Sequence, residues 1–174
     1  RFMDRQENGI WLPDKQLSAA LIDNRAMLAL ISIERIWNEL ERIILGPNAD
    51  FVLARMNRDG VLPAIIGYPL PFESFELVTK LPSDLEARIA ILFSSLKSLE
   101  VNDILMRLRA PKKVIKRCRH LHFLIDNTPA EHELRLYRMV VSKEVNTHIS
   151  LASATGKVTS LIEKSLQYPT DITC

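Results

Sequence analysis

The clearest hydrophobic pattern in the chain lies in the stretch ISIERIWNELERIILGP, residues 31–47. Its apolar residues recur every three or four positions, a spacing that places them along one face of an α-helix. Ser32 is a good N-cap, because its hydroxyl can accept a hydrogen bond from a free backbone N–H of the first turn. Gly46 can adopt the left-handed conformation that closes a helix, and Pro47 prevents continuation. The pattern predicts a helix over residues 32–45, with a core-facing stripe of Ile33, Ile36, Trp37, Leu40, Ile43 and Ile44.

Most of the remaining chain also has helical patterns. Ser83, followed three residues later by Glu86, predicts a capping box at the start of one helix. Pro111 and Pro129 stand where a proline is tolerated in the first turn of a helix. No segment alternates convincingly as a strand would, and residues 142–156 are the most ambiguous. We therefore predict an all-α fold, an array of short to medium helices without a significant sheet, over 14–28, 32–45, 48–59, 83–96, 101–110, 111–126, 129–145 and 156–167.

One proline-rich stretch suggests a boundary within this array. Pro69 and Pro71 interrupt the chain in the segment GYPLPF. We therefore divide the chain into residues 1–67 and residues 68–174, and treat each part as a helical region.

Composition and cysteine content place the protein among intracellular globular chains. Its 174 residues are enough for a sizeable core, and 47% of them are hydrophobic. No long uncharged apolar run exists, so no membrane span is expected, and the charged residues 1–9 do not resemble a signal peptide. Cys118 and Cys174 form neither a disulfide framework nor a metal motif, so a reduced, cytoplasmic protein is expected. Because the chain begins with Arg rather than Met, we also expect it to be part of a longer protein.

The distribution of charge is more informative than the net charge of +2. Residues 1–87 hold nine Lys or Arg and thirteen Asp or Glu, whereas residues 88–174 hold fourteen and eight. The basic half contains a stretch without any acid between Asp103 and Asp126. Such a stretch is either a solvated helix surface or a contact with a polyanion, in which each cation that meets a phosphate releases a counterion. Its candidate RNA-binding residues are Arg107, Arg109, Lys112, Lys113, Lys116, Arg117 and Arg119.

Helical spacing predicts how these cations are arranged. On the helix that starts near Pro111, the cations Lys113, Lys116 and Arg117 and the side chain of His120 share one face. The opposite face carries Val114, Cys118, Leu121 and Ile125.

No catalytic or metal constellation is recognisable in the sequence. There is no Gly-rich phosphate loop, no Ser or Cys nucleophile motif and no Asp-x-Asp pair for two Mg²⁺ ions. His120 and His122 are two residues apart, so on a helix they point to different faces and do not readily share a metal. By spacing alone, Glu34 caps its helix and Arg35 pairs with Glu39. We therefore assign neither catalytic residues nor metal ligands to this chain.

The stretch ISIERIWNELERIILGPNADFVLARMNRDGVLPAII resembles the neck-to-body region of bacterial class II CCA-adding tRNA nucleotidyltransferases and the related poly(A) polymerases. The resemblance covers about residues 25–67 and is loose beyond them, where it consists mainly of helicity and the basic RLR segment. The matching positions are Ile31, Ser32, Glu34, Arg35, Ile36, Glu39 and Leu40, followed by Gly60, Val61 and Leu62.

The resemblance implies a parent enzyme whose chemistry occurs outside this chain. In the family, a catalytic head binds two metal ions through an acidic pair, and a neck motif reads the incoming nucleotide; neither motif is present here. The chain then corresponds to part of the neck with the body and tail: residues 1–67 would be a neck and body region, and residues 68–174 an RNA-binding body and tail region. It would have no cofactor of its own, whereas the full-length enzyme would use Mg²⁺ with ATP and CTP. Its implied partners are tRNA or another structured RNA and the missing head, and its implied role is to position tRNA for CCA addition. Glu34 and Arg35 would support the neck.

Two alternatives remain open. The parent enzyme could synthesise poly(A) or add only part of the CCA sequence, and these differences are usually carried by the head and neck. The chain could also be a helical scaffold that binds proteins and no RNA, although it shows no repeat of the period expected for stacked-helix arrays.

Overall fold

The structure, a computed structural model, describes residues 13–170. Residues 1–9 and Cys174, which entered two of the sequence arguments, lie outside this range. All regular secondary structure in the described range is helical, which confirms the predicted all-α array. The α-helices are α1 (Lys15–Asp23), α2 (Ile33–Leu45), α3 (Ala49–Arg58), α4 (Val61–Ile66), α5 (Glu73–Val78), α6 (Leu85–Leu92), α7 (Ser98–Arg107), α8 (Lys112–Asp126), α9 (Leu134–Val141), α10 (Val145–Ala154) and α11 (Ser160–Lys164), and the 3₁₀ helices are η1 (Arg25–Leu30), η2 (Glu131–Glu133), η3 (Ser142–Glu144) and η4 (Ser165–Gln167).

Helix α2 forms where the hydrophobic pattern predicted it, and its stripe faces the core. Trp37, Leu40 and Ile44 are buried, and Ser32 is the N-cap residue, but its hydroxyl does not accept the predicted capping hydrogen bond among the described residues. The predicted end is wrong in one detail: Gly46 has φ −68° and ψ 157°, an extended rather than a left-handed conformation. Pro47 explains the difference, because a proline ring disfavours helical backbone in the residue before it.

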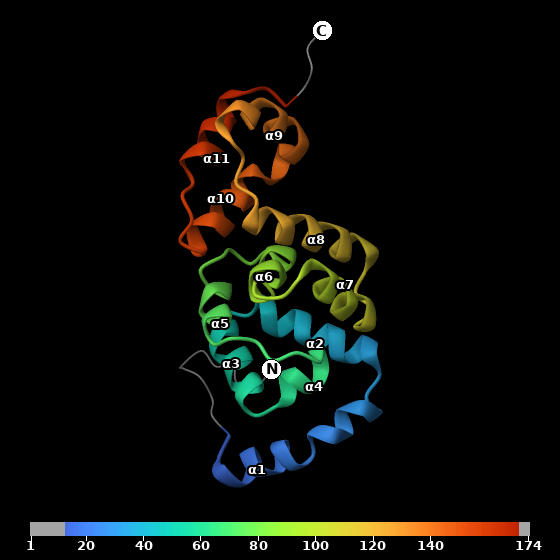
Figure 1. Ribbon diagram of the computed structural model, residues 1–174. Coiled ribbons are helices and arrows are strands. Elements are labelled where there is room, and N and C mark those ends of the chain that lie inside the picture. The colour runs from blue at the N-terminus through green and yellow to red at the C-terminus, as the bar shows by residue number, and fades with distance from the viewer. Residues whose placement is uncertain (1–12, 171–174) are drawn as a thin grey trace.

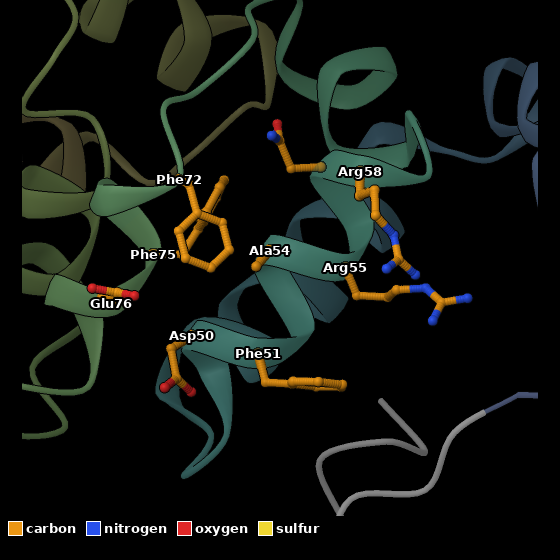
Figure 2. A pocket seen from close by; sticks show the side chains of 9 residues that line it. Asp50, Phe51, Ala54, Arg55, Arg58, Phe72, Phe75 and Glu76 are labelled. Carbon is orange, nitrogen blue, oxygen red and sulfur yellow. The ribbon is translucent and has the colours of Figure 1, made fainter.

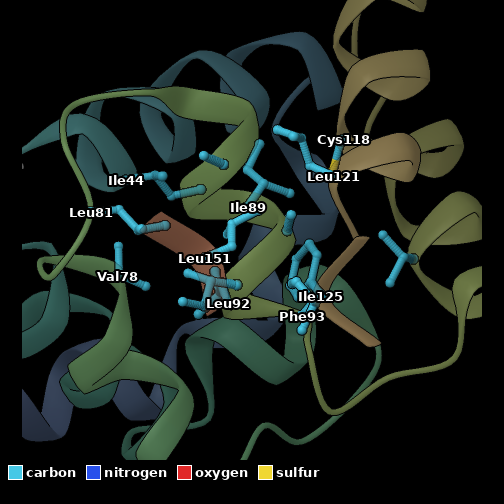
Figure 3. Packing of buried hydrophobic residues seen from close by; sticks show 14 of the residues in the cluster. Ile44, Val78, Leu81, Ile89, Leu92, Phe93, Cys118, Leu121, Ile125 and Leu151 are labelled. Atoms are coloured by element: carbon cyan, nitrogen blue, oxygen red, sulfur yellow. The ribbon is translucent and has the colours of Figure 1, made fainter. Parts of the chain in front are cut away.

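Helix α6 lies at the centre of the core. Figure 3 shows the buried side chains of Ile89 and Leu92 in α6 and of Phe93, which directly follows it. The helix packs against α2, α5 and α8. Every residue from Ala87 to Leu92 is buried, including Arg88. The guanidinium of Arg88 donates to the backbone carbonyls of Ile44, Gly46, Leu81 and Pro82. A buried charge therefore joins the end of α2 to the segment that precedes α6.

The predicted start of α6 is shifted by one residue. Asp84, not Ser83, is the N-cap, and its carboxylate accepts a hydrogen bond from the Ala87 amide at 3.1 Å. Glu86 does not complete a capping box, because its carboxylate faces Arg117 of α8. The ambiguous residues 142–156 form η3 and α10, and Gly156 follows α10 in the left-handed conformation with φ 72°.

The helices form an elongated array, with α1 at one end and α9, α10 and α11 at the other (Figure 1). Helices on both sides of residue 67 contribute to one hydrophobic cluster, and α3 packs against α5 across the proline-rich segment. The division at residue 67 stays a prediction. Among residues 13–170, no helix has the length and apolar character needed to cross a membrane.

Candidate nucleic-acid interface

Helices α7 and α8 enclose a groove of about 630 Å³ on the protein surface. We call it the α7–α8 groove. Its wall on α8 is mainly cationic and its wall on α7 is polar and apolar. Among residues 13–170, no carboxylate lines it. The lining residues are Ser98, Asn102, Met106, Lys112, Ile115, Lys116, Arg119, His120 and Phe123.

The helical register of α8 brings three of the predicted cations into this groove. Lys112, Lys116 and Arg119 are four and three residues apart, so they lie along one face of the helix. All three side chains are exposed. Within residues 13–170, none of them forms a salt bridge, whereas other cations of the chain do. Their charges are therefore available to an anion from outside the chain.

The same groove exposes apolar groups between its cations. The side chains of Met106 and Phe123 are 60% and 56% exposed, and Ile115 is half-buried. On the α7 side, Asn102 and Ser98 provide hydrogen-bonding groups. The groove thus combines cations, an aromatic ring and polar groups, the mixture expected of a surface that meets both phosphates and bases.

Arg117 of α8 is turned away from this groove and is held by three carboxylates. Its guanidinium lies 2.6 Å from Asp84, 3.0 Å from Glu86 and 2.7 Å from Glu144. Three-quarters of the Arg117 side chain is buried, at 26% exposure. The prediction that Arg117 shares a solvent-facing basic surface with Lys113 and Lys116 is therefore wrong in geometry, because acids from two distant segments pack against it.

The ion pairs of Arg117 shift the pKa values of its partners. Hydrogen bonds from Arg117 lower the pKa of Glu144 and outweigh its burial. Burial raises the pKa of Asp84, but hydrogen bonds from Arg117 and the Ala87 amide outweigh it and leave the pKa below its usual value. Asp84 and Glu144 therefore stay ionised to lower pH than usual, and with Arg117 they hold α8 against the start of α6 and against η3.

Two further predicted cations connect the end of α7 to the first 67 residues. The guanidinium of Arg107 donates to the carbonyl of Ile66 and packs on Gly67, where an added Cβ would lie 2.8 Å from it. Arg109 is bonded to the carboxylate of Glu34, at the start of α2. A backbone hydrogen bond and the bond from Arg109 lower the pKa of Glu34.

In the part of the chain that the structure describes, the remaining predicted residues, Lys113 and Arg35, have no comparable contacts. Lys113 and Arg35 are exposed, and Lys113 does not line the α7–α8 groove. The predicted Arg35–Glu39 pair is not formed among the described residues; Glu39 accepts from Arg42 at 3.1 Å. The structure brings Glu34 to the basic stretch and leaves Arg35 apart, and the roles of both in the neck stay predictions.

A second pocket, of about 580 Å³, lies between α3 and α5 and was not predicted (Figure 2). Phe72 and Phe75 approach α3 near Ala54, and Phe72 is 63% exposed. Arg55 in its lining is engaged internally, because it binds Asp59 at 2.6 Å and the Ser18 hydroxyl at 2.9 Å. The lining also contains the carboxylates of Asp50 and Glu76. Opposed charges make this pocket a poorer match for a polyanion than the α7–α8 groove. An aromatic residue, Phe72, that directly follows the proline pair Pro69 and Pro71 was a sequence signal that could have indicated it.

His122, His148 and Cys118 are buried and occupy structural positions, whereas His120 lines the α7–α8 groove. His122 is buried and bonds to the Phe93 carbonyl at 3.1 Å, and His148 bonds to the Tyr137 hydroxyl. Burial and the Glu86 carboxylate raise the pKa of the Cys118 thiol to about 12. Over the described part of the chain, no group of three or more His, Cys, Asp or Glu is placed to hold a metal ion.

Comparison with known protein families finds a similarity in the first part of the chain. Residues 13–70 match a family model described as the probable RNA and SrmB-binding site of polymerase A. The match spans α1 to α4 and ends before α5. No curated protein and no solved structure matches the chain. Residues 13–70 are thus similar to the RNA-binding region of the poly(A) polymerase family.

Proposed function

We propose that this chain is the RNA-holding part of a tRNA nucleotidyltransferase or poly(A) polymerase, and that the α7–α8 groove binds the RNA backbone. One observation carries the proposal: Lys112, Lys116 and Arg119 line a groove that contains no carboxylate, and none of them is engaged in an ion pair among the described residues. The match of residues 13–70 to an RNA-binding family region supports it independently.

The three cations act on phosphates through charge and spacing. Lys112 and Lys116 lie one helical turn apart on α8, and Arg119 continues the row. Each cation that neutralises a phosphate releases a condensed counterion, so affinity falls as salt concentration rises. Such contacts fix the position of the RNA without reading its sequence.

The end of α7 connects this groove to the family-matched region. Met106 lines the groove, the next residue, Arg107, binds the Ile66 carbonyl, and Arg109 binds Glu34. RNA held in the groove would therefore lie beside residues 13–70 on a continuous part of the protein. In this arrangement Glu34 positions Arg109, and both lie at the junction.

The finer assignment is CCA addition to tRNA 3′ ends by a bacterial, cytoplasmic enzyme whose catalytic head precedes this chain. The head would use Mg²⁺ with ATP and CTP. The described residues do not fit a metal site, so we assign no step of nucleotide transfer to them. Poly(A) synthesis by the same kind of enzyme is the alternative. Assays of the enzyme that carries this chain, with ATP alone and with CTP plus ATP, distinguish the two.

RNA binding by the chain itself tests the groove. We expect tRNA to bind with an affinity that falls steeply with salt, and Lys116→Glu with Arg119→Glu to weaken binding and reduce the slope of log affinity against log salt by about 2. The matched control is Lys80→Glu with Arg135→Glu, the same charge change at two exposed cations outside the groove.

The outcome of this comparison decides the proposal. Circular dichroism establishes that both double variants keep their helical content. Equal loss of affinity in the two double variants, or binding by neither the parent chain nor its variants, would contradict RNA binding at the groove. Salt-insensitive binding to a protein, without affinity for RNA, would support the scaffold alternative.

A further inference from the structure

We propose that the ring of Phe123 stacks on one unpaired base of the bound RNA, so that the α7–α8 groove selects single-stranded RNA over duplex. The inference rests on the proposed function and adds to it the class of RNA that the groove accepts. It follows from where Phe123 lies on α8 and from what surrounds it.

Phe123 is an exposed aromatic residue on the cationic face of a helix that already has a complete apolar face. The buried residues of α8 include Cys118, Leu121 and Ile125, which pack in the core. Phe123 is 56% exposed and belongs instead to the groove lining. Contact between a half-exposed phenylalanine ring and water is unfavourable, because the apolar surface of the ring stays hydrated. A polar residue at this position would not have this cost. A ligand that covers the ring would remove this apolar surface from water and gain the corresponding free energy.

The register of α8 places this ring in line with the cations. Phe123 follows Arg119 by four residues and Lys116 by seven, so the three side chains lie along one face of the helix. A nucleotide whose phosphate meets Arg119 or Lys116 would present its base near the ring. Alternation of phosphate-binding cations with an aromatic surface is the arrangement by which proteins bind single strands.

The opposite wall of the groove suits a base rather than a second row of phosphates. Met106 on α7 presents a 60% exposed thioether side chain, and Asn102 provides both a donor and an acceptor. In a duplex, the base faces are already stacked on one another and only edges, sugars and phosphates are accessible. The apolar and aromatic part of the groove therefore contributes to binding only when a base is unstacked.

The α3–α5 pocket also contains an exposed aromatic ring, Phe72, but its lining includes carboxylates of Asp50 and Glu76 that repel phosphates. This contrast makes Phe72 a matched control. It has a similar ring, is also exposed, and lies outside the cationic groove.

The test compares a fluorescein-labelled twelve-nucleotide oligo(A) with a blunt twelve-base-pair duplex, both titrated with the chain at the same salt concentration. We expect tighter binding of the single strand. Phe123→Leu, which keeps an apolar side chain without the ring, should weaken single-strand binding about tenfold and leave duplex binding unchanged. Phe123→Tyr should retain the preference, and Phe72→Leu should not alter it.

Salt titration separates this inference from the proposed function. Phe123→Leu should leave the slope of log affinity against log salt unchanged, because it removes no cation, whereas Lys116→Glu with Arg119→Glu should reduce it. Equal effects of Phe123→Leu on single strand and duplex, or no effect on either, would overturn base stacking while salt-dependent binding still supported the groove. If the parent chain itself does not bind RNA, both the stacking of Phe123 and the proposed function are overturned.

Discussion

Arg109, just after α7, donates a hydrogen bond to the carboxylate of Glu34 in the first turn of α2, although 75 residues separate them in the sequence. The contact joins a residue of the predicted neck support to a residue of the predicted basic stretch. Arg109 is therefore placed by a partner in the family-matched region, and the end of α7 is fixed on α2.

The backbone of Arg109 is unusual, with φ 52° in the left-handed region. The Ala110 amide donates to the Leu105 carbonyl and the Arg109 amide to the Met106 carbonyl, both at 3.0 Å. These two hydrogen bonds form a Schellman motif, in which glycine is the usual residue at the position of Arg109. An L-residue there carries strain of about 1 kcal/mol. An arginine at this position therefore costs stability relative to glycine.

Replacement of this residue by glycine should expose that cost. We expect Arg109→Gly to raise the free energy of unfolding by up to about 1 kcal/mol, because the relief of strain exceeds the loss of an exposed ion pair. Arg109→Ala should give no such gain, since alanine keeps the strain and also loses the pair. Urea denaturation of the three proteins measures the order, and an alanine variant as stable as the glycine variant would contradict the role of strain.

Arg117 should contribute more to stability than any other cation of the basic stretch. Arg117→Met leaves Asp84, Glu86 and Glu144 without their shared partner in a partly buried site. We expect the free energy of unfolding to fall by about 2 kcal/mol at neutral pH, less than for a fully buried pair because water reaches this site. Lys113→Met, at an exposed residue of the same helix, is the control and should change stability by less than about 0.5 kcal/mol. Equal effects of the two substitutions would contradict the structural role of Arg117.

The carboxylates around Arg117 also predict how stability depends on acid. The pKa values of Asp84 and Glu144 are lowered from 3.8 and 4.5 in the folded chain. Their contribution is therefore fully present above the ordinary pKa values and is lost as pH falls through the lowered ones. We expect the stability difference between the parent chain and Arg117→Met to shrink steadily as pH falls below about 4.5. Denaturant titrations at a series of acidic pH values measure this difference, and a constant difference would refute the assignment.

Much of the fold could be predicted from the sequence, because apolar spacing and helix-stop residues act locally. Trp37, Leu40 and Ile44 recur with the helical period and are buried. The errors are also local, because in each case a neighbouring residue determines the backbone or the cap at the predicted position. Pro47 determines the backbone of Gly46, and Asp84 caps α6 where Ser83 was expected. In both places an adjacent residue has the stronger effect.

The site was less predictable, because the partners of its cations come from distant segments. Helical spacing placed Arg117 near Lys113 on α8, but nothing local shows that Asp84 and Glu144 pack against it. Spacing alone could have grouped Phe123 with Lys116 and Arg119, since they are separated by whole helical turns. The exposure of Phe123 was the missing fact, and it depends on the packing of α7.

His148 should make stability depend on pH in a separate, less acidic window. His148 is 1% exposed, and its ring bonds to the Tyr137 hydroxyl. Its helix, α10, is one of the helices at the C-terminal end of the array (Figure 1). Burial lowers the pKa of His148 to about 4; a backbone hydrogen bond at Leu124 opposes the shift, and the charges of His120 and Lys157 add to it.

Because the unfolded chain binds a proton near pH 6.5 and the folded chain does not, stability should fall as pH drops from about 6.5 to about 4, by up to about 3 kcal/mol. The contribution is fully present above pH 6.5, and the window lies mostly above that of the carboxylates around Arg117. His148→Gln, which cannot titrate, should be less stable at pH 7.5 and should lose most of this pH dependence. Denaturant titrations of both proteins between pH 4.5 and 7.5 measure the two slopes. Parallel slopes would mean that another group binds the proton, since removal of His148 would then leave the linkage between protonation and unfolding intact.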